Sequence, residues 1–197
     1  MRVILASNSP RRRELLTQIG VDYEVIPSGF EEKSINRSPS ELVKHFAYMK
    51  AAAVAASIKE EALVIGADTI VYLDEVMGKP RNEEDAFQML LKLSGKEHYV
   101  LSGVSVIHTL TKQYITEYES TRVKIRHLSE EEIRSYISTG EPMDKAGAYA
   151  IQGLGSLFVE GIAGDYFNVV GLPLFRLGEM LKSFKIDLMK NNMLVGE

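Results

Sequence analysis

The sequence contains no cysteine among its 197 residues. This absence excludes disulfide bonds, thiolate catalysis and cysteine-ligated zinc, and it is typical of proteins from a reducing compartment. An excess of basic residues is also missing, because 23 Lys and Arg stand against 27 Asp and Glu, for a formal net charge of −4. We therefore expect neither a nucleic-acid groove nor binding to an anionic membrane surface.

Long apolar runs are lacking as well, and the chain starts directly in a strand-like pattern without the apolar segment of a signal peptide. The histidines predict no metal site, since positions 45, 98, 108 and 127 are far apart and in no ligand spacing. We expect a soluble, cytoplasmic protein. With 45% hydrophobic residues it can fold as one domain over 1–197, with two lobes and a frayed tail after about residue 188.

The stretch 5–16 predicts a buried strand, a hydroxyl-rich turn and a helix start, with Ser9 as N-cap and Pro10 in the first helical position. Three arginines, 11–13, occupy the first helical turn, where each cation is disfavoured by roughly 0.3–1 kcal/mol. A bound phosphate would reverse that cost, because backbone N–H groups, serine hydroxyls and guanidinium groups would all point to it. The alternative is an ordinary capped helix with solvated arginines.

A second helix is predicted from Ser38 to about Ser57, with a capping box at its start. Lys50 falls inside its apolar arc, which consists of Leu42, Phe46, Met49 and Ala53, extended by Val43, Ala47 and Val54. A lysine in that place either extends its ammonium to the edge of the arc or meets a buried anion.

The most apolar strand-like run, 63–73, contains a single charge, Asp68. A carboxylate inside a core strand has to be neutralised by a proton, a cation or a metal, and such carboxylates are frequent among catalytic acids, bases and metal ligands. The alternative is that Gly66 opens a bulge and Asp68 caps a turn.

The other expected elements follow from caps, breakers and alternation. They are a strand at 23–26, a hairpin tip at 74–75, a helix from Asn82 to Gly95 with the stripe Ala86, Met89, Leu90 and Leu93, an antiparallel hairpin of 97–107 and 114–125, a helix from Ser129 to about 139, a glycine-rich hairpin over 157–170 and a last helix over 174–184.

The unexpected polar groups are mostly cations: Ser7, Ser9, Arg11, Arg12, Arg13, Glu32, Lys50, Asp68, Lys79, Lys145 and Gln152. Cations can hold the phosphates of a polyphosphate ester, while carboxylates activate water or bind a divalent metal. For Glu32, which follows Glu31 in a loop, plain solvation is the alternative. No Walker A motif is present, and Gly153-x-Gly155 lacks the third glycine of a dinucleotide fingerprint. The residues therefore favour phosphoanhydride chemistry on a metal-bound small phosphate compound.

Six separated motifs follow one another in order: SNSPRRRELL, GADTIV, GKPRN, LSG, DKAGAYAIQGLG and VVGLPL. Together they resemble the Maf family of nucleotide pyrophosphatases over nearly the whole chain. The resemblance implies hydrolysis of nucleoside triphosphates to the monophosphate and pyrophosphate with a divalent cation, Mg²⁺ or Mn²⁺. It also implies an elongated mixed α/β sheet with flanking helices, similar to the inosine triphosphate pyrophosphatase (Ham1-like) fold, with two lobes around an active cleft.

The resemblance further implies roles for single residues. Asp68 matches the catalytic proton acceptor and, with Glu32, a metal ligand. Arg11 and Arg12, with Ser9 beside them, match phosphate-binding positions, and Arg12 and Thr69 match positions that affect substrate choice. Glu32, Lys50 and Lys79 match a polar ring around the triphosphate, and Lys145 lies in the glycine-rich segment. Gln152 matches a position that discriminates between bases. The RR pair and AIQG are similar to the branch that prefers dTTP and UTP.

A rival function is a non-catalytic nucleotide-binding regulator of septum formation, which the family's naming suggests. The resemblance leaves room for a homodimer, for a cell-division partner and for modified pyrimidine nucleotides as substrates. Binding alone has little use for a carboxylate that faces phosphates, so Asp68 favours an enzyme.

Overall fold

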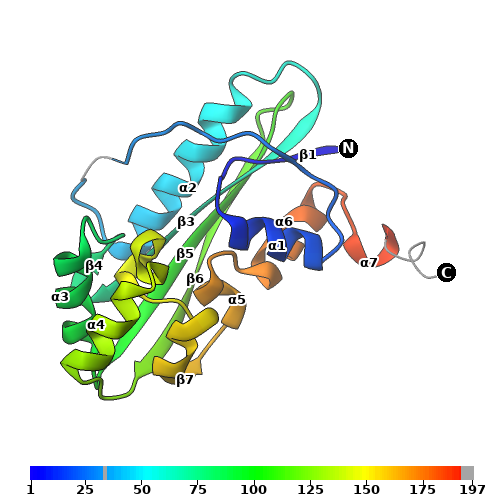
Figure 1. Ribbon diagram of the computed structural model, residues 1–197. Helices are drawn as coiled ribbons and strands as arrows, with labels where there is room; N and C mark the ends of the chain where they lie inside the picture. The colour runs from blue at the N-terminus through cyan, green and yellow to red at the C-terminus, as the bar shows by residue number, and fades with distance from the viewer. Residues whose placement is uncertain (33–34, 192–197) are drawn as a thin grey trace. The chain divides into compact units, whose positions relative to one another are not determined.

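The structure is a computed structural model that describes residues 1–32 and 35–191. A seven-stranded sheet runs in the order β2-β1-β3-β5-β6-β7, with β4 paired to β3, and helices flank it (Figure 1). The sheet is mixed, because β1 pairs in parallel with β2 and β3 while β4 and β7 pair antiparallel with β3 and β6. The expected mixed α/β fold is confirmed.

Two compact units divide the chain. The first contains 1–68, 102–119 and 171–197, and the second contains 69–101 and 120–170. Three long strands, β3 (Ala62–Leu73), β5 (Glu97–His108) and β6 (Tyr114–Ile125), pass from one unit into the other along the chain. Five residues connect β5 to its sheet neighbour β6, which is too short for a parallel crossover, so the expected antiparallel hairpin is confirmed.

In the first unit, β1 (Arg2–Leu5) lies between β2 (Glu24–Val25) and β3. Helix α1 (Pro10–Gln18) connects β1 to β2, and α2 (Pro39–Ala55) connects β2 to β3 in the opposite direction along the sheet. Because crossovers between parallel strands are right-handed, the two helices cover opposite faces. The chain thus reverses its direction along the sheet at β2, and the topological switch point lies between β1 and β3. Helices α6 (Leu174–Ser183) and α7 (Leu188–Asn191) complete this unit. The frayed tail was expected after about residue 188; α7 covers 188–191, and the rest of the tail lies outside the described residues.

Helix α2 begins at the expected capping box of Ser38 and Glu41 and packs tightly on the sheet. A Cβ atom at Gly66 would overlap the carbonyl oxygen of Ala47, so glycine permits the helix to touch β3. Gly66 therefore serves a close approach rather than a bulge. The buried arc includes Ala51 in place of the expected Ala53, which is exposed. Lys50 lies beside Ala51 on this sheet-facing side.

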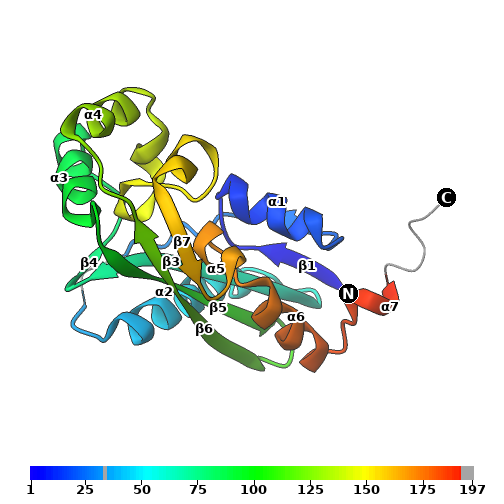
Figure 2. The same ribbon diagram turned by 90° about the horizontal axis from the view of Figure 1, so that it is seen from below.

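The second unit contains β4 (Glu75–Met77), α3 (Glu83–Leu93), α4 (Glu130–Ser138), the 3₁₀ turns η1 (Glu141–Asp144), η2 (Ala146–Ala148) and η3 (Gly153–Phe158), β7 (Val159–Ala163) and α5 (Tyr166–Val170). Helices α3 and α4 lie side by side in both views (Figures 1 and 2) and bury Leu90, Leu93 and Ile133. Phe87 is buried in α3 although the expected stripe omitted it.

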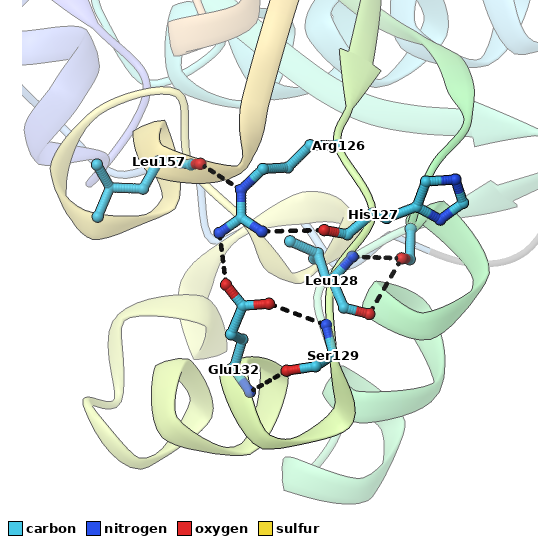
Figure 3. A network of polar contacts seen from close by, with 7 residues as sticks. Arg126, His127, Leu128, Ser129, Glu132 and Leu157 are labelled. Atoms are coloured by element: carbon cyan, nitrogen blue, oxygen red, sulfur yellow. Dashed lines mark hydrogen bonds and ion pairs between the residues drawn. The ribbon is translucent and has the colours of Figure 1, made fainter.

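A polar network surrounds the start of α4 (Figure 3). Glu132 closes the expected capping box with Ser129 and accepts a 2.7 Å hydrogen bond from Arg126, whose Nε donates to the carbonyl oxygen of Leu157. Together with the backbone bond from Ser129, the Arg126 contact lowers the pKa of Glu132 to about 2. This network holds the end of η3 against β6 and α4.

The expected glycine-rich hairpin over 157–170 is wrong. Only β7 is a strand in that range, and after Gly164 the chain enters α5. The Asp165 carboxylate accepts the N–H of Phe167 at 2.8 Å, and Thr121 Oγ1 bonds to the backbone of Asp165, so a helical turn starts where the second strand was expected. Within the described residues, no helix has the length and apolar character needed to span a membrane.

We predict that Gly66→Ala lowers the free energy of unfolding by about 1–3 kcal/mol, because the added methyl group has to push α2 off β3. The control is Gly178→Ala in α6, where a Cβ meets nothing within 4 Å. Removal of a helical glycine should stabilise by about 0.5–1 kcal/mol there. Urea unfolding measures both, and equal effects of the two substitutions would contradict the close packing.

Candidate functional site

The turn between β1 and α1 holds Arg12 in a fixed place. Its Nη1 donates to Ser7 Oγ at 3.2 Å, and its Nε donates to the carbonyl oxygen of Gly171 at 2.9 Å. Burial lowers the pKa of Arg12, and the nearby Asp68 carboxylate opposes that shift. All three opening arginines are half-buried, and the solvated alternative is wrong for Arg12 because its guanidinium is held by Ser7 and Gly171.

Ser9 is the N-cap residue of α1, as expected, but its side chain makes no capping hydrogen bond. Its backbone N–H donates to Ser7 Oγ at 3.2 Å. Ser7 thus organises the turn by accepting from both Ser9 and Arg12. The first turn of α1 contains no acidic residue, so it keeps the positive character noted in the sequence.

Asp68 is buried in β3 with only 5% of its surface exposed. Its Oδ1 accepts a 2.7 Å hydrogen bond from Lys50 Nζ, whereas the buried Oδ2 has no hydrogen-bond partner among the described residues. Burial raises the pKa of Asp68, Lys50 acts against that rise, and the Glu32 carboxylate adds to it. The carboxyl group is therefore a stronger base than a solvated aspartate.

Lys50 bridges two carboxylates. Its Nζ lies 2.7 Å from Asp68 Oδ1 and 2.6 Å from Glu32 Oε1, and its own side chain is only 13% exposed. The snorkelling alternative is thus wrong, and the buried-anion interpretation is confirmed. Glu32 is nearly half exposed, so it is both solvated and paired, while Glu31 is exposed.

The strand register explains why these groups lie together. Leu5 at the end of β1 pairs with Ile65 of β3, so Asp68 stands three residues beyond the end of β1, next to the turn that contains Ser7 and Arg12. This is the carboxyl edge of the parallel strands β1 and β3, at the topological switch point between them. Open α/β sheets bind ligands in this place.

A divalent metal has a partial donor set here. No group of three His, Cys, Asp or Glu side chains that could hold an ion occurs in 1–32 and 35–191. The unpartnered Oδ2 of Asp68 and the carboxylate of Glu32 are nevertheless hard oxygen donors near one another. Mg²⁺ usually takes one or two carboxylates and completes its shell with water and substrate phosphates, so these residues fit it.

The second unit brings another set of expected residues together. The N–H of Gly147 donates to the carbonyl oxygen of Gly78 at 3.0 Å, which joins the loop of exposed Lys79 to the segment of Lys145. Lys145 Nζ donates to the carbonyl oxygen of Glu141 at 2.7 Å and also pairs with Asp144. Half-buried Gln152 lies at the start of η3 in the same unit, and Thr69 is half-buried in β3.

Two anchors of this second set were missed in the sequence. Glu141 accepts hydrogen bonds from Tyr136 Oη and from the N–H groups of Leu154 and Gly155. His98, expected to be an ordinary histidine, is 1% exposed, and its Nε2 lies 2.7 Å from the hydroxyl of Tyr149. Burial lowers the pKa of His98 to about 4, so the imidazole is neutral at pH 7. Neither residue has a periodic signal in the sequence.

Comparison with protein families matches residues 2–184 to the model described as Maf-like protein. The chain belongs to this family. Among curated proteins, a dTTP/UTP pyrophosphatase of Thermoanaerobacter sp. (strain X514) is 53% identical over 183 residues, covering 92% of this chain and 96% of the relative. Another dTTP/UTP pyrophosphatase, from Alkaliphilus oremlandii, is 53% identical over 190 residues, covering 95% and 99%. The resemblance drawn from the six motifs is confirmed.

Among solved structures, a Ham1 protein of Staphylococcus aureus matches with a TM-score of 0.43 and 17% identity, covering 64% of this chain and 72% of that one.

We predict that Lys50→Met lowers the free energy of unfolding at pH 7 by about 3 kcal/mol, because it leaves the buried Asp68 carboxylate unpaired. Without the ammonium the pKa of Asp68 rises further. Below that pKa the carboxyl is neutral and needs no partner, so the loss should shrink as the pH falls.

The matched control is Lys124→Met, which removes an ion pair with Glu160 in which both side chains are about half exposed. Its expected cost is at most about 1 kcal/mol. Urea unfolding at several pH values measures both variants. Equal losses, or a Lys50→Met loss that grows toward acid pH, would contradict the burial of the pair.

Proposed function

We propose that the chain hydrolyses dTTP and UTP, and related modified pyrimidine nucleotides, to the monophosphate and pyrophosphate. The names of the curated relatives support this activity, since proteins about half identical over nearly the whole chain are dTTP/UTP pyrophosphatases. The observation that carries the proposal within the chain is the buried Asp68 carboxyl, with its raised pKa and one oxygen that has no hydrogen-bond partner in 1–32 and 35–191.

In the proposed reaction, Asp68 removes a proton from the water that attacks the α-phosphorus. A base is most effective when its pKa approaches the working pH, so the burial that raises the pKa of Asp68 favours this role. Lys50 keeps enough of the carboxyl ionised at neutral pH and fixes its direction through the 2.7 Å bond to Oδ1. The Oδ2 atom, which Lys50 does not bind, is the atom that takes the proton.

The phosphates are proposed to bind at the positive start of α1. Arg12 is preorganised, because its Nε and Nη1 are fixed by Gly171 and Ser7 before any ligand arrives. Arg11 and Ser9 come from the same turn, and N–H groups at a helix start add to the attraction for anions. These groups would neutralise the charge of the departing pyrophosphate, which is where transition-state charge accumulates.

Four further residues are proposed to bind the nucleotide. Lys79 and Lys145 supply further positive charge for phosphates, and Thr69 contributes to substrate choice. Gln152 is assigned to the base, because an amide offers both a donor and an acceptor to a pyrimidine edge.

A divalent cation, Mg²⁺ or Mn²⁺, is proposed: it would be held by the carboxyl groups of Asp68 and Glu32 together with phosphate oxygens. When bound, such an ion stabilises negative charge on the phosphates and makes water more acidic. Glu32 and Asp68 are already brought together by Lys50, so the chain's own contribution is to hold two oxygen donors beside the turn of Arg12.

A second candidate is a non-catalytic nucleotide sensor in septum formation, acting with a cell-division partner or as a homodimer. Its binding needs the cations of the α1 turn but gains nothing from a buried carboxylate that repels phosphates. We favour the enzyme for that reason, and we propose the cytoplasm, where nucleotide pools are, as its location.

We predict that Asp68→Asn lowers kcat for dTTP at least about 100-fold while dTTP still binds, because the amide cannot accept the proton from water. Pyrophosphate release in the presence of Mg²⁺ or Mn²⁺ measures turnover, and calorimetric titration measures binding. The control is Asp22→Asn, an exposed aspartate of the same unit, which should retain wild-type turnover.

The wild-type protein in the same assay separates the candidate functions. Faster turnover of dTTP and UTP than of guanine and adenine nucleotides supports the proposal. Near-normal turnover by Asp68→Asn would disprove the proton-acceptor role, tight dTTP binding without pyrophosphate release would favour the sensor, and preference for guanine nucleotides would disprove the pyrimidine assignment.

A further inference from the structure

The start of η3 is capped from a distance. Gln152 is the N-cap residue of this turn, and the N–H groups that follow an N-cap need acceptors. The side chain of Gln152 makes no capping bond. Instead, Glu141 Oε2 accepts the N–H of Leu154 at 3.0 Å, and Glu141 Oε1 accepts the N–H of Gly155 at 2.9 Å. A carboxylate eleven positions before Gln152 thus does the work of the cap.

The two glycines after Gln152 fit this carboxylate. Gly153 has φ +68°, and a Cβ atom there would lie 2.7 Å from Glu141 Oε2. A Cβ atom at Gly155 would lie 2.7 Å from Tyr136 Oη and 2.5 Å from the carbonyl oxygen of Ala150. Any larger residue at either place would push the backbone away from Glu141. Glycine at 153 and 155 therefore allows the backbone to pack closely against the Glu141 side chain and its partner Tyr136.

Glu141 is itself held firmly. Tyr136 Oη donates to Oε1 at 2.9 Å. Burial alone would raise the pKa of Glu141, but the hydrogen bonds from Gly155, Leu154 and Tyr136 lower it. The carboxyl group is therefore ionised at pH 7. Its backbone carbonyl also accepts the 2.7 Å bond from Lys145 Nζ. One residue thereby fixes the positions of both Lys145 and the backbone beside Gln152.

We propose that Glu141 is the positioning residue for base selection. Its carboxylate caps η3 in place of Gln152, which sets the direction of the Gln152 side chain and leaves the amide available to a pyrimidine edge. Glu141 touches neither base nor phosphate and acts only through the backbone of 152–155. The inference rests on the proposed function, because it takes Gln152 as the residue that contacts the base.

Glu141→Gln tests the role with little change of shape. The amide keeps one acceptor oxygen and places an NH₂ group against a backbone N–H. We expect the ratio of kcat/KM for dTTP over dGTP to fall about tenfold, the loss typical of one hydrogen bond to a charged group. The KM for dTTP should rise while kcat changes little, because Asp68 is untouched. Amide hydrogen exchange at Leu154 and Gly155 should become faster.

The matched control is Glu132→Gln, because Glu132 is the other capping carboxylate of the same unit (Figure 3). Its partner Arg126 holds Leu157 at the far end of η3, so this variant loosens the same turn away from Gln152. It should retain the wild-type dTTP/dGTP ratio. An equal fall in both variants would overturn the proposal, because general loosening would then explain the effect.

Gln152→Ala separates the base contact of Gln152 from the positioning role of Glu141. If Gln152 contacts the base, its removal lowers the ratio, and Glu141→Gln should add nothing in that background. Three results would overturn the positioning role. They are an unchanged dTTP/dGTP ratio in Glu141→Gln, an additive loss in the double variant, and unchanged amide exchange at Leu154 and Gly155. If Gln152→Ala leaves the ratio unchanged, the base assignment fails and the positioning role fails with it, whereas pyrophosphate release by the wild-type protein would still support the proposed activity.

Discussion

The ammonium of Lys50 lies between the carboxylates of Asp68 and Glu32, and the architecture of the first unit depends on that contact. Asp68 is buried in a strand, where a lone charge would be costly, so a cation has to reach it. Helix α2 can supply the cation only because Gly66 lets the helix touch β3. Packing, ionisation and the chemistry proposed for Asp68 are therefore consequences of one close approach between a helix and a strand.

In the second unit, a carboxylate stabilises irregular backbone instead of a buried ion pair. The segment from Gly140 to Phe158 contains three short 3₁₀ turns, which have few internal hydrogen bonds of their own. Glu141 supplies the missing acceptors, and the His98–Tyr149 contact holds the segment from the side of β5. Irregular backbone can thus hold Lys145 and Gln152 in fixed places, which their proposed roles in nucleotide binding require.

The sequence predicts those features that depend on local pattern. A charge in an apolar period marks Asp68 and Lys50, and capping boxes mark the starts of α2 and α4. The pairing of Glu32 with Lys50 could not be predicted, because a loop residue has no periodicity that places it. Glu141 was missed because its partners are backbone N–H groups, which look alike in every residue. The hairpin expected over 157–170 failed because the Asp165 turn outweighs β propensity there.

The most direct test is a pH titration of the Asp68 side chain, monitored by NMR of protein labelled with ¹³C-aspartate. The Asp68 signal is assigned by its absence in the Asp68→Asn variant. We expect a pKa above the ordinary value of 3.8, because burial outweighs the attraction of Lys50. A pKa at or below 3.8 would contradict it, since the carboxyl group would then be a simple ion-pair partner of Lys50 and too weak a base for the role proposed here.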